Sequence, residues 1–467
     1  MQRSQKTLES YGSEDRSETE STDRSATSMR IAQSMEQVTH DDLMKAVVDD
    51  DNIDRALKRV VGNRGAPGVD GMAVDDLEPW LHNNREDFRN EILNGNYIPT
   101  PVRRKEIPKD SGGVRKLGIP TAKDRLVQQM VAQVLTPIYD PTFSESSFGF
   151  RPGRSAQDAV KKAVSYIEDG YIYGIGIDLE KFFDTLPQRE LMNVLRERIK
   201  DRVLIQLIKR FLRAGVVLPD GLTQATESGA PQGGPLSPLL SNIYLDRLDK
   251  ELESRGLRFC RYADDSIILV RSERAAGRVC ETVTRFLEEE LHLKVNRDKT
   301  EVGSVKGMSF LGFTFYRNRG AGAYPSRKAQ AKFRKRIREL TKRNRGVSPE
   351  AVLRDLRTYE RGWFGYFRIG LHKDRAGKLD SWIRRRVRQY FMKCWKNQKT
   401  KWRNLAKLCP QELRCPDGTP STLWTKQVRA VACRSGYWAP SNYPAVKNGM
   451  DIKWLRNQGM YFLSDNL

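Results

Sequence analysis

The sequence predicts an α+β fold in which a body of mixed helices and strands is followed by a helical, strongly basic third. Residues 171–178 alternate between large and small side chains at a period of two, which is the pattern of a β-strand. Residues 327–395 contain three stretches with apolar side chains every three or four positions, which is typical of amphipathic helices. The 467 residues leave room for about three domains.

The basic residues are concentrated at one end of the chain. Residues 326–467 hold 34 Lys and Arg against 10 Asp and Glu, whereas residues 1–325 hold 48 against 49. A net charge of +24 in one third of the chain predicts a polyanionic partner such as nucleic acid. No apolar run approaches the roughly 18–20 residues of a membrane-spanning helix, and no secretory signal is evident, so we expect no membrane partner and a cytoplasmic location.

The first part of the chain divides into a polar segment and a structured body. Residues 1–40 are polar and nearly free of bulky apolar side chains, so we expect disorder there. Within residues 41–325, the stretch "PVRRKEIPKDSGGVRKLGIP" (101–120) predicts a β-hairpin with Lys109 and Arg115 flanking its turn. Cations on such a hairpin can bind a triphosphate. The alternative is a solvated hairpin tip with no ligand.

Two stretches place carboxylates at the ends of strands. In "YIYGIGIDLEKFFDTL" (171–186), Gly174, Gly176 and Asp178 share one face, and the small residues leave space beside the carboxylate. In "RFCRYADDSIILV" (258–270), Asp264 and Asp265 lie between two apolar strands. An ordinary turn would also explain the aspartate pair, because Asp is common in turns.

The three aspartates together favour a metal site. Two-metal nucleotidyl transfer needs carboxylates from separate strands that converge on Mg²⁺ ions roughly 3.5–4 Å apart. Mg²⁺ takes oxygen ligands, and carboxylates gathered without a cation would raise one another's pKa. Asp178, Asp264 and Asp265 are therefore the candidate catalytic residues and the candidate ligands of two Mg²⁺ ions.

These motifs stand in the order found in a known family. "DLEKFFD" (178–184), "PQGGPLSPLLSNIYL" (231–245), "YADD" (262–265), "LKVNRDKTEV" (293–302) and "FLGFTF" (310–315) resemble the reverse transcriptase blocks. "SFGFRPGRSAQDAV" and "LRTYERGWFGYFRIG" are similar to the fingers and the maturase region of bacterial group II intron-encoded proteins. The resemblance runs from about residue 45 almost to the end of the printed sequence.

The resemblance implies an architecture and an activity. It implies a right-hand polymerase with fingers, a palm built on an antiparallel sheet, a helical thumb and a small basic C-terminal domain. The expected activity is RNA-directed DNA synthesis together with intron maturation, with group II intron RNA, a DNA target and primer, and dNTPs as partners. We place the fingers and palm at residues 41–325, the thumb or maturase domain at 326–400, and a DNA-binding-like region at 401–467.

The resemblance also implies roles around the incoming nucleotide. Lys109 and Arg115 match cations that grip the triphosphate, and Phe183 matches the ring that excludes a 2′-hydroxyl. Gln232 would pack beside the incoming base pair, and Lys299 would approach the leaving pyrophosphate. No Cys/His endonuclease pattern follows the basic tail, so we do not expect second-strand cleavage by this chain.

The basic third has its own pattern. In each of its three expected helices, over residues 327–343, 348–367 and 378–395, apolar side chains form one stripe and cations occupy the rest. On the third helix we expect Arg384, Arg385, Arg386 and Arg388 to face nucleic acid. Charged faces that are merely solvated are the alternative.

Two other functions fit parts of the sequence. One is an RNA-binding splicing factor whose polymerase fold is catalytically dispensable, and the intact aspartate set argues against it. The other is a retron or defence-type reverse transcriptase, which would lack the basic maturase-like region. The sequence leaves open which intron and DNA target are bound, whether that intron is mobile, where the cDNA primer comes from, and whether the chain forms a homodimer.

Overall fold

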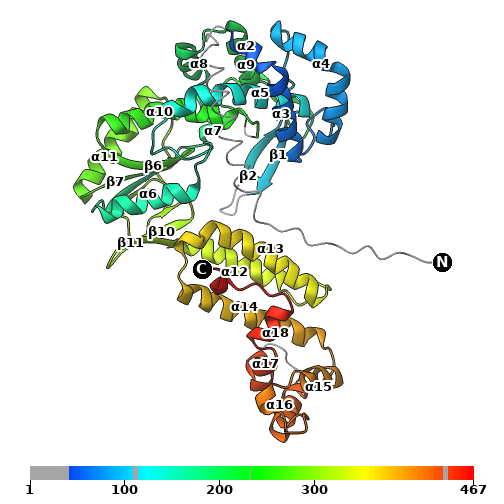
Figure 1. Cartoon of the computed structure of the whole chain (residues 1–467). Coiled ribbons are helices and arrows are strands. Elements are labelled where there is room, and N and C mark those ends of the chain that lie inside the picture. Colours follow the sequence, from blue (N-terminus) through cyan, green and yellow to red (C-terminus); the bar gives the residue numbers. More distant parts are fainter. Residues whose placement is uncertain (1–41, 109–113, 232, 435–439) are drawn as a thin grey trace, which may run out of the picture.

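The computed structural model describes residues 42–108, 114–231, 233–434 and 440–467. The expected disorder of residues 1–40 and the turn of the 101–120 hairpin lie outside the described residues. The chain combines helices with three small sheets, so the expected α+β class is confirmed. Figure 1 shows a body of helices and sheet, three long helices below it, and a group of short helices at the far end.

The fingers form around one buried helix. Their elements are α2 (Leu43–Val47), α3 (Asp50–Gly62), α4 (Leu77–Leu93), β1 (Val102–Pro108), β2 (Val114–Ile119), α5 (Ala122–Tyr139) and α9 (Arg202–Arg213). Strands β1 and β2 pair antiparallel with Ile107 opposite Arg115, so the expected hairpin is confirmed. Two short strands, β4 (Val216–Val217) and β5 (Thr223–Gln224), extend this sheet in the order β2-β1-β4-β5. Most of α5 is buried, and Thr121 caps its first turn by accepting from the Asp124 amide.

The palm is a four-stranded antiparallel sheet covered on both faces. Its strands are β6 (Arg258–Tyr262), β7 (Asp265–Val270), β3 (Tyr173–Ile177) and β8 (Glu301–Ser304), side by side in that order. Ile268 and Val270 pack on the face covered by α10 (Ser237–Ser254) and α11 (Glu273–Arg285). Ile267 and Leu269 point to the opposite face, which is covered by α6 (Ala156–Glu168). The helices α7 (Phe182–Thr185) and α8 (Gln188–Arg198) follow β3.

The thumb begins directly after a small sheet. That sheet contains β9 (Ser309–Phe310), β10 (Phe313–Arg317) and β11 (Ala321–Pro325), and the thumb helices are α12 (Arg327–Leu340), α13 (Pro349–Phe367) and α14 (Lys373–Cys394). Side-chain caps at Ser326 and Ser348 begin α12 and α13. The Phe333 and Trp363 rings pack with centroids 4.3 Å apart between these helices. All three expected helices are confirmed with their apolar stripes buried.

The C-terminal region docks on the last thumb helix. It contains α15 (Gln398–Lys407), α16 (Thr422–Ala432), α17 (Pro444–Gly449) and α18 (Ile452–Asn457), seen at the far end of Figure 1. The buried Asp380 carboxylate on α14 accepts from the Leu463 and Ser464 amides, each at 2.9 Å. The expected boundary at residue 400 falls inside α15, just after the non-helical residues 395–397.

No helix in the described part of the chain is long and apolar enough to cross a membrane.

Candidate active site

The β6–β7 turn presents Asp264 and Asp265 at the edge of the palm. Tyr262 pairs with Asp265 across the hairpin, so only Ala263 and Asp264 form the turn. Ala263 has a φ of 57°, a left-handed conformation that is uncommon for residues other than glycine. Gly149 packs so closely below this turn that a side chain there would collide with the Ala263 backbone nitrogen. The turn therefore has an unusual backbone conformation and packs directly against Gly149.

The sheet register brings Asp178 to the same place. Strand β3 pairs antiparallel with β7, and the last pair is Ile177 with Ser266. One further step places Asp178 opposite Asp265, where cross-strand Cβ atoms are usually about 5 Å apart. Both side chains project from the sheet face that α6 covers, because Asp265 has the same parity as Ile267. The predicted meeting of the two strand-end carboxylates is thus present in the register.

Burial and, to a smaller extent, the crowding of like charges perturb the carboxylates of this cluster. Burial raises the pKa of Asp265 to about 6, and the charges of Asp264 and Asp178 add to the effect. Asp265 is nevertheless exposed at the surface, so solvent reaches its carboxylate. Lys299 opposes the shift, and its Nζ lies 3.2 Å from Asp178 Oδ2. This lysine contacts a candidate metal ligand directly, a contact that the sequence did not indicate.

The oxygen donors of the cluster fit a divalent metal. Three carboxylates are the donors that Mg²⁺ prefers, and a cation between them would relieve the repulsion that raises the Asp265 pKa. Among the described residues, no three or more His, Cys, Asp or Glu side chains are already gathered as a formed metal site would be. Lys299 lies against Asp178 instead, in an ion pair whose lysine side chain is 65% exposed. Such an exposed pair is worth little and is easily displaced.

A buried ion pair below the turn was not predicted from the sequence. Arg261 and Asp249 are 1% and 0% exposed, and Arg261 Nε donates to Asp249 Oδ1 at 2.7 Å. The same guanidinium donates to the Asn242 side chain at 3.0 Å, the Ala263 carbonyl at 3.1 Å and Ser147 Oγ at 2.9 Å. Arg261 therefore connects helix α10 with the backbone of the turn that carries Asp264.

The space expected beside Asp178 is filled at one of its two glycines. The small residues beside Asp178 were expected to leave space for a ligand. At Gly174 the space is filled by Met308, because an added Cβ would lie only 2.5 Å from the methionine sulfur. Gly176, one step nearer to Asp178, has the same side chain at 3.9 Å, which is ordinary contact.

Part of the expected nucleotide site is described by the structure. Phe183 is half-buried, and its carbonyl accepts from the Ala230 amide at 2.7 Å, which joins α7 to the loop before α10. The same loop reaches the fingers, where the Gly233 backbone lies against the Gly118 carbonyl of β2. Gln232 in this loop and Lys109 lie outside the described residues. The backbone of Arg115 lies in strand β2.

The four thumb arginines have different environments. Arg385 is exposed and Arg384 is half-buried, whereas the Arg386 Nε donates to Thr341 Oγ1 at 2.9 Å and so ties α14 to the end of α12. Arg388 is only 8% exposed, and its Nε donates to the Met450 carbonyl at 2.9 Å. The expectation that Arg388 faces nucleic acid is therefore wrong, because its guanidinium holds the C-terminal region to α14.

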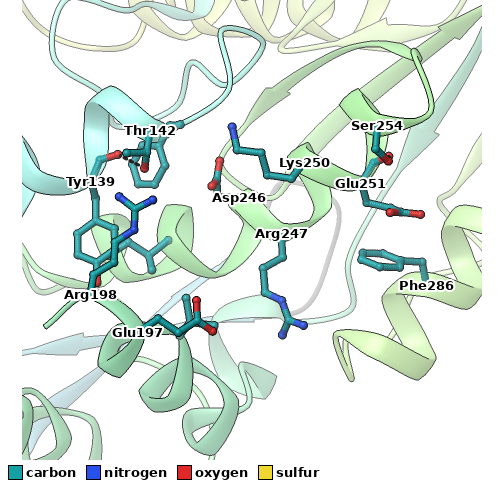
Figure 2. Close-up of a pocket in the computed structure, with 13 residues that line it drawn as sticks. Tyr139, Thr142, Glu197, Arg198, Asp246, Arg247, Lys250, Glu251, Ser254 and Phe286 are labelled. Atoms are coloured by element: carbon teal, nitrogen blue, oxygen red, sulfur yellow. Dashed lines mark hydrogen bonds between the residues drawn. The ribbon is translucent and has the colours of Figure 1, made fainter.

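A separate cavity of about 380 Å³ lies on the other side of α10 from the sheet, among helices of the fingers and palm. Figure 2 shows acidic and basic side chains from several elements around it, including Glu197, Arg198, Asp246 and Lys250. Burial raises the pKa of Asp246 to about 6. None of the three candidate catalytic aspartates lines this cavity, so it is distinct from the active site.

Comparisons with known proteins agree with this geometry. Residues 107–315 match the family model described as reverse transcriptase (RNA-dependent DNA polymerase), and residues 330–408 match the group II intron maturase-specific domain. Protein YkfC of Escherichia coli is 33% identical over 318 residues, which cover 59% of this chain and 83% of that protein.

Two intron proteins are also similar. The group II intron-encoded protein LtrA of Lactococcus lactis is 37% identical over 45% of this chain and 35% of its own length. The putative COX1/OXI3 intron 2 protein of Saccharomyces cerevisiae is 35% identical over 55% of this chain and 36% of its own length. The chain thus spans most of YkfC but about a third of these two longer relatives.

The palm sheet, its strand-end carboxylates and the matched polymerase model define a reverse transcriptase, an RNA-directed DNA polymerase. The maturase-specific match extends this class into the thumb and argues against a retron or defence-type enzyme. The chain belongs to the family of group II intron-encoded reverse transcriptases and maturases. Such a fold implies dependence on a divalent metal and binding of intron RNA.

Proposed function

We propose that the chain copies group II intron RNA into cDNA at a site where Asp178, Asp264 and Asp265 hold two Mg²⁺ ions. The observation that carries this proposal is the β3–β7 register, which sets Asp178 opposite Asp265 beside a turn that bears Asp264. Bound Mg²⁺ would supply charge neutralisation for the primer hydroxyl and the triphosphate. Two ions, rather than one, follow from the number of carboxylates and the reaction class.

The chain's own residues orient the reactants. In the reaction the primer 3′-hydroxyl loses its proton to solvent and its oxygen bonds to the α-phosphorus of a dNTP. The bond between that phosphorus and the α–β bridging oxygen breaks, and pyrophosphate leaves with the bridging oxygen. Lys299, whose Nζ lies 3.2 Å from Asp178 Oδ2, would contact that leaving group once it moves from the carboxylate. Phe183 would sit beneath the sugar, with Gln232 beside the base and with Lys109 and Arg115 on the triphosphate.

The substrates and partners follow from the same assignment. Intron RNA and a primed DNA target are the nucleic acids, and dNTPs are the small substrates, in a bacterial cytoplasmic setting during splicing and retrohoming. The C-terminal third would grip RNA through Arg384, Arg385 and the part of Arg386 not held by Thr341. Two chains acting as a homodimer are part of the proposal, as is the division into fingers and palm, thumb, and a C-terminal DNA-binding region.

The test is primer extension on an RNA template with Mg²⁺. Asp264→Asn removes one metal ligand without adding bulk, so we expect extension to be abolished while the circular dichroism spectrum is unchanged. Asp246→Asn makes the same chemical change in the separate cavity on the other side of α10 and should extend primers normally. Extension by Asp264→Asn at more than a few per cent of the unmodified rate would refute the metal assignment.

A further inference from the structure

A basic cavity of about 710 Å³ lies between α12, α14 and the end of β11. Its size falls within the roughly 300–1,000 Å³ typical of ligand pockets. The lining includes Tyr324, Arg334, Arg338, Arg375, Lys378 and Trp382, and none of the described residues that line it is acidic. The four cations named here are exposed, and none forms an ion pair with a carboxylate of the described residues.

Two of these cations are stacked on aromatic rings. The Arg338 guanidinium lies 5.7 Å from the centroid of Trp382, and the Arg375 guanidinium lies 4.5 Å from that of Tyr324. Trp382 and Tyr324 are half-buried, so each ring is fixed by packing while part of it stays accessible. Fixed aromatic rings among cations are what proteins use to bind unpaired nucleotides, with rings stacking on bases and cations contacting phosphates.

Trp363 also lines the cavity and is 9% exposed. Its indole Nε1 is inaccessible to solvent and has no hydrogen-bond partner among the described residues, so the ring offers carbon atoms rather than this donor to the cavity.

This cavity lies on the side of the thumb away from the catalytic carboxylates. A second cavity, lined by Ala329, Lys332 and Arg336 of α12, adjoins the palm at residues 311–312 and includes Tyr366. Burial raises the pKa of Tyr366, with smaller contributions from Tyr262 and Asp265, so that cavity is near the active site. At 3.6 residues per turn, the α12 residues of the two cavities lie about 160° apart around the helix.

We propose that the cavity between α12 and α14 binds an unpaired nucleotide of a nucleic acid strand that is not the template–primer in the active site. A base stacks on Trp382 or Tyr324, and its flanking phosphates contact Arg334, Arg338, Arg375 and Lys378. The proposal rests on the proposed function only in that the ligand is a nucleic acid. It predicts recognition of a bulge or single strand, whereas a solvated basic face would treat all polyanions alike.

The experiment measures binding of a short, unstructured, fluorescent RNA to the full chain. The active site is first saturated with an unlabelled, chain-terminated template–primer, so that the labelled strand reports other sites. Base stacking contributes about 1–3 kcal/mol, so Trp382→Leu should weaken binding by about 5- to 150-fold with an unchanged salt slope. Trp382→Phe keeps an aromatic ring and should restore most of the affinity. A blunt RNA duplex should bind the Trp382→Leu variant and the unmodified chain equally.

Charge variants test the phosphate contacts. Replacing Arg334 and Arg338 by Gln should flatten log K against log[salt] by about 1.4, at about 0.7 per single-strand phosphate contact. Replacing Lys328 and Lys335 by Gln is the matched control, because it removes the same charge from α12 at exposed positions outside both cavities. The control should leave the slope and the affinity nearly unchanged.

Several outcomes would overturn the proposal. One is an equal slope of log K against log[salt] for the Arg334/Arg338 variant and the Lys328/Lys335 control. Another is an RNA affinity of Trp382→Leu as high as that of the unmodified chain. Displacement of the RNA by a glutamate-rich peptide but not by unlabelled RNA or DNA would identify a protein-binding surface instead. A matched DNA strand distinguishes the source, since preference for RNA assigns the intron and preference for DNA assigns the target. Mg²⁺-dependent primer extension by each variant is measured separately. Failure of the cavity proposal would therefore show in RNA binding, whereas failure of the polymerase proposal would show in primer extension.

Discussion

Replacing Arg261 by methionine should destabilise the palm more than almost any other single change near the active site. Arg261 and Asp249 are 1% and 0% exposed, so the substitution leaves an uncompensated carboxylate in the interior. Breaking a buried pair by removing one partner typically costs about 3–5 kcal/mol. The Asn242 side chain and the Ala263 carbonyl also lose their arginine donor, at 3.0 and 3.1 Å.

A second substitution separates stability from catalysis. In Arg261→Met with Asp249→Leu both charges are gone, and apolar replacement of a whole buried pair is often neutral. We expect the double variant to regain most of the lost stability, with a residual cost of about 1–3 kcal/mol from the unpaired Asn242 oxygen. DNA synthesis should stay low in both variants, because the Ala263 carbonyl has lost the contact that fixes the turn beside Asp264.

The assay combines urea unfolding, followed by circular dichroism and tryptophan fluorescence, with primer extension at a temperature where all variants are folded. If Arg261→Met lowered the free energy of unfolding by less than about 1 kcal/mol, the predicted role of the buried ion pair would be wrong. Full recovery of DNA synthesis in the double variant would show that the turn does not depend on Arg261. Arg255, which pairs with Glu251 at the partly exposed end of α10, provides the control, and Arg255→Met should have little effect on either property.

Three further predictions follow from the site and the thumb. Phe183→Val should raise ribonucleotide relative to deoxyribonucleotide incorporation in single-nucleotide extension, and an unchanged ratio would mean that another residue forms the gate. Arg388→Gln should lower the free energy of unfolding by about 1–3 kcal/mol, because the buried hydrogen bond to the Met450 carbonyl is lost. Arg385→Gln should leave the free energy of unfolding unchanged, but it should flatten the slope of log K against log[salt] for RNA binding by about 0.7–0.9. Asp246→Asn should stabilise the folded chain by at most about 3 kcal/mol above pH 6, because burial raises the pKa of Asp246 from 3.8 to about 6 and the folded state opposes its ionisation. The gain should fall to about 0.5 kcal/mol at pH 4, where the carboxyl is largely protonated in the folded state. Equal effects on urea unfolding at pH 4 and pH 7.5 would contradict this prediction.

The strand-end carboxylates were predictable because they depend on local periodicity. Alternation along β3 and the two-residue turn after β6 fix the face of Asp178 and the position of Asp264 without long-range information. The thumb helices were predictable for the same reason, since their stripes and caps lie within single segments. The hairpin of the fingers also depends on one local turn signal.

The features that the sequence did not predict correctly all depend on contacts between segments far apart in the chain. Arg388 adjoins the apolar stripe of α14, and periodicity alone marks it as surface. It is buried because Met450, about sixty residues further along the chain, docks against it. The alternation along β3 predicted open space beside Gly174, but Met308, from a later segment of the chain, occupies that space. The Arg261–Asp249 ion pair could not be predicted, because in the sequence these two residues cannot be distinguished from two separate charges on the surface. Only the tertiary structure brings them together.

The charge of the C-terminal third is therefore divided between binding and structure. Of its 34 basic residues, some are used inside the fold: Arg388 bonds Met450, and Arg345 pairs with Asp355 at 2.6 Å. A guanidinium engaged in this way contacts no phosphate and releases no counterion when RNA binds. The salt dependence of RNA binding should accordingly reflect the exposed cations, such as Arg385 and those of the cavity between α12 and α14, and should be far smaller than the net charge suggests. The remaining positive charge acts at longer range, where it speeds association with RNA rather than adding contacts.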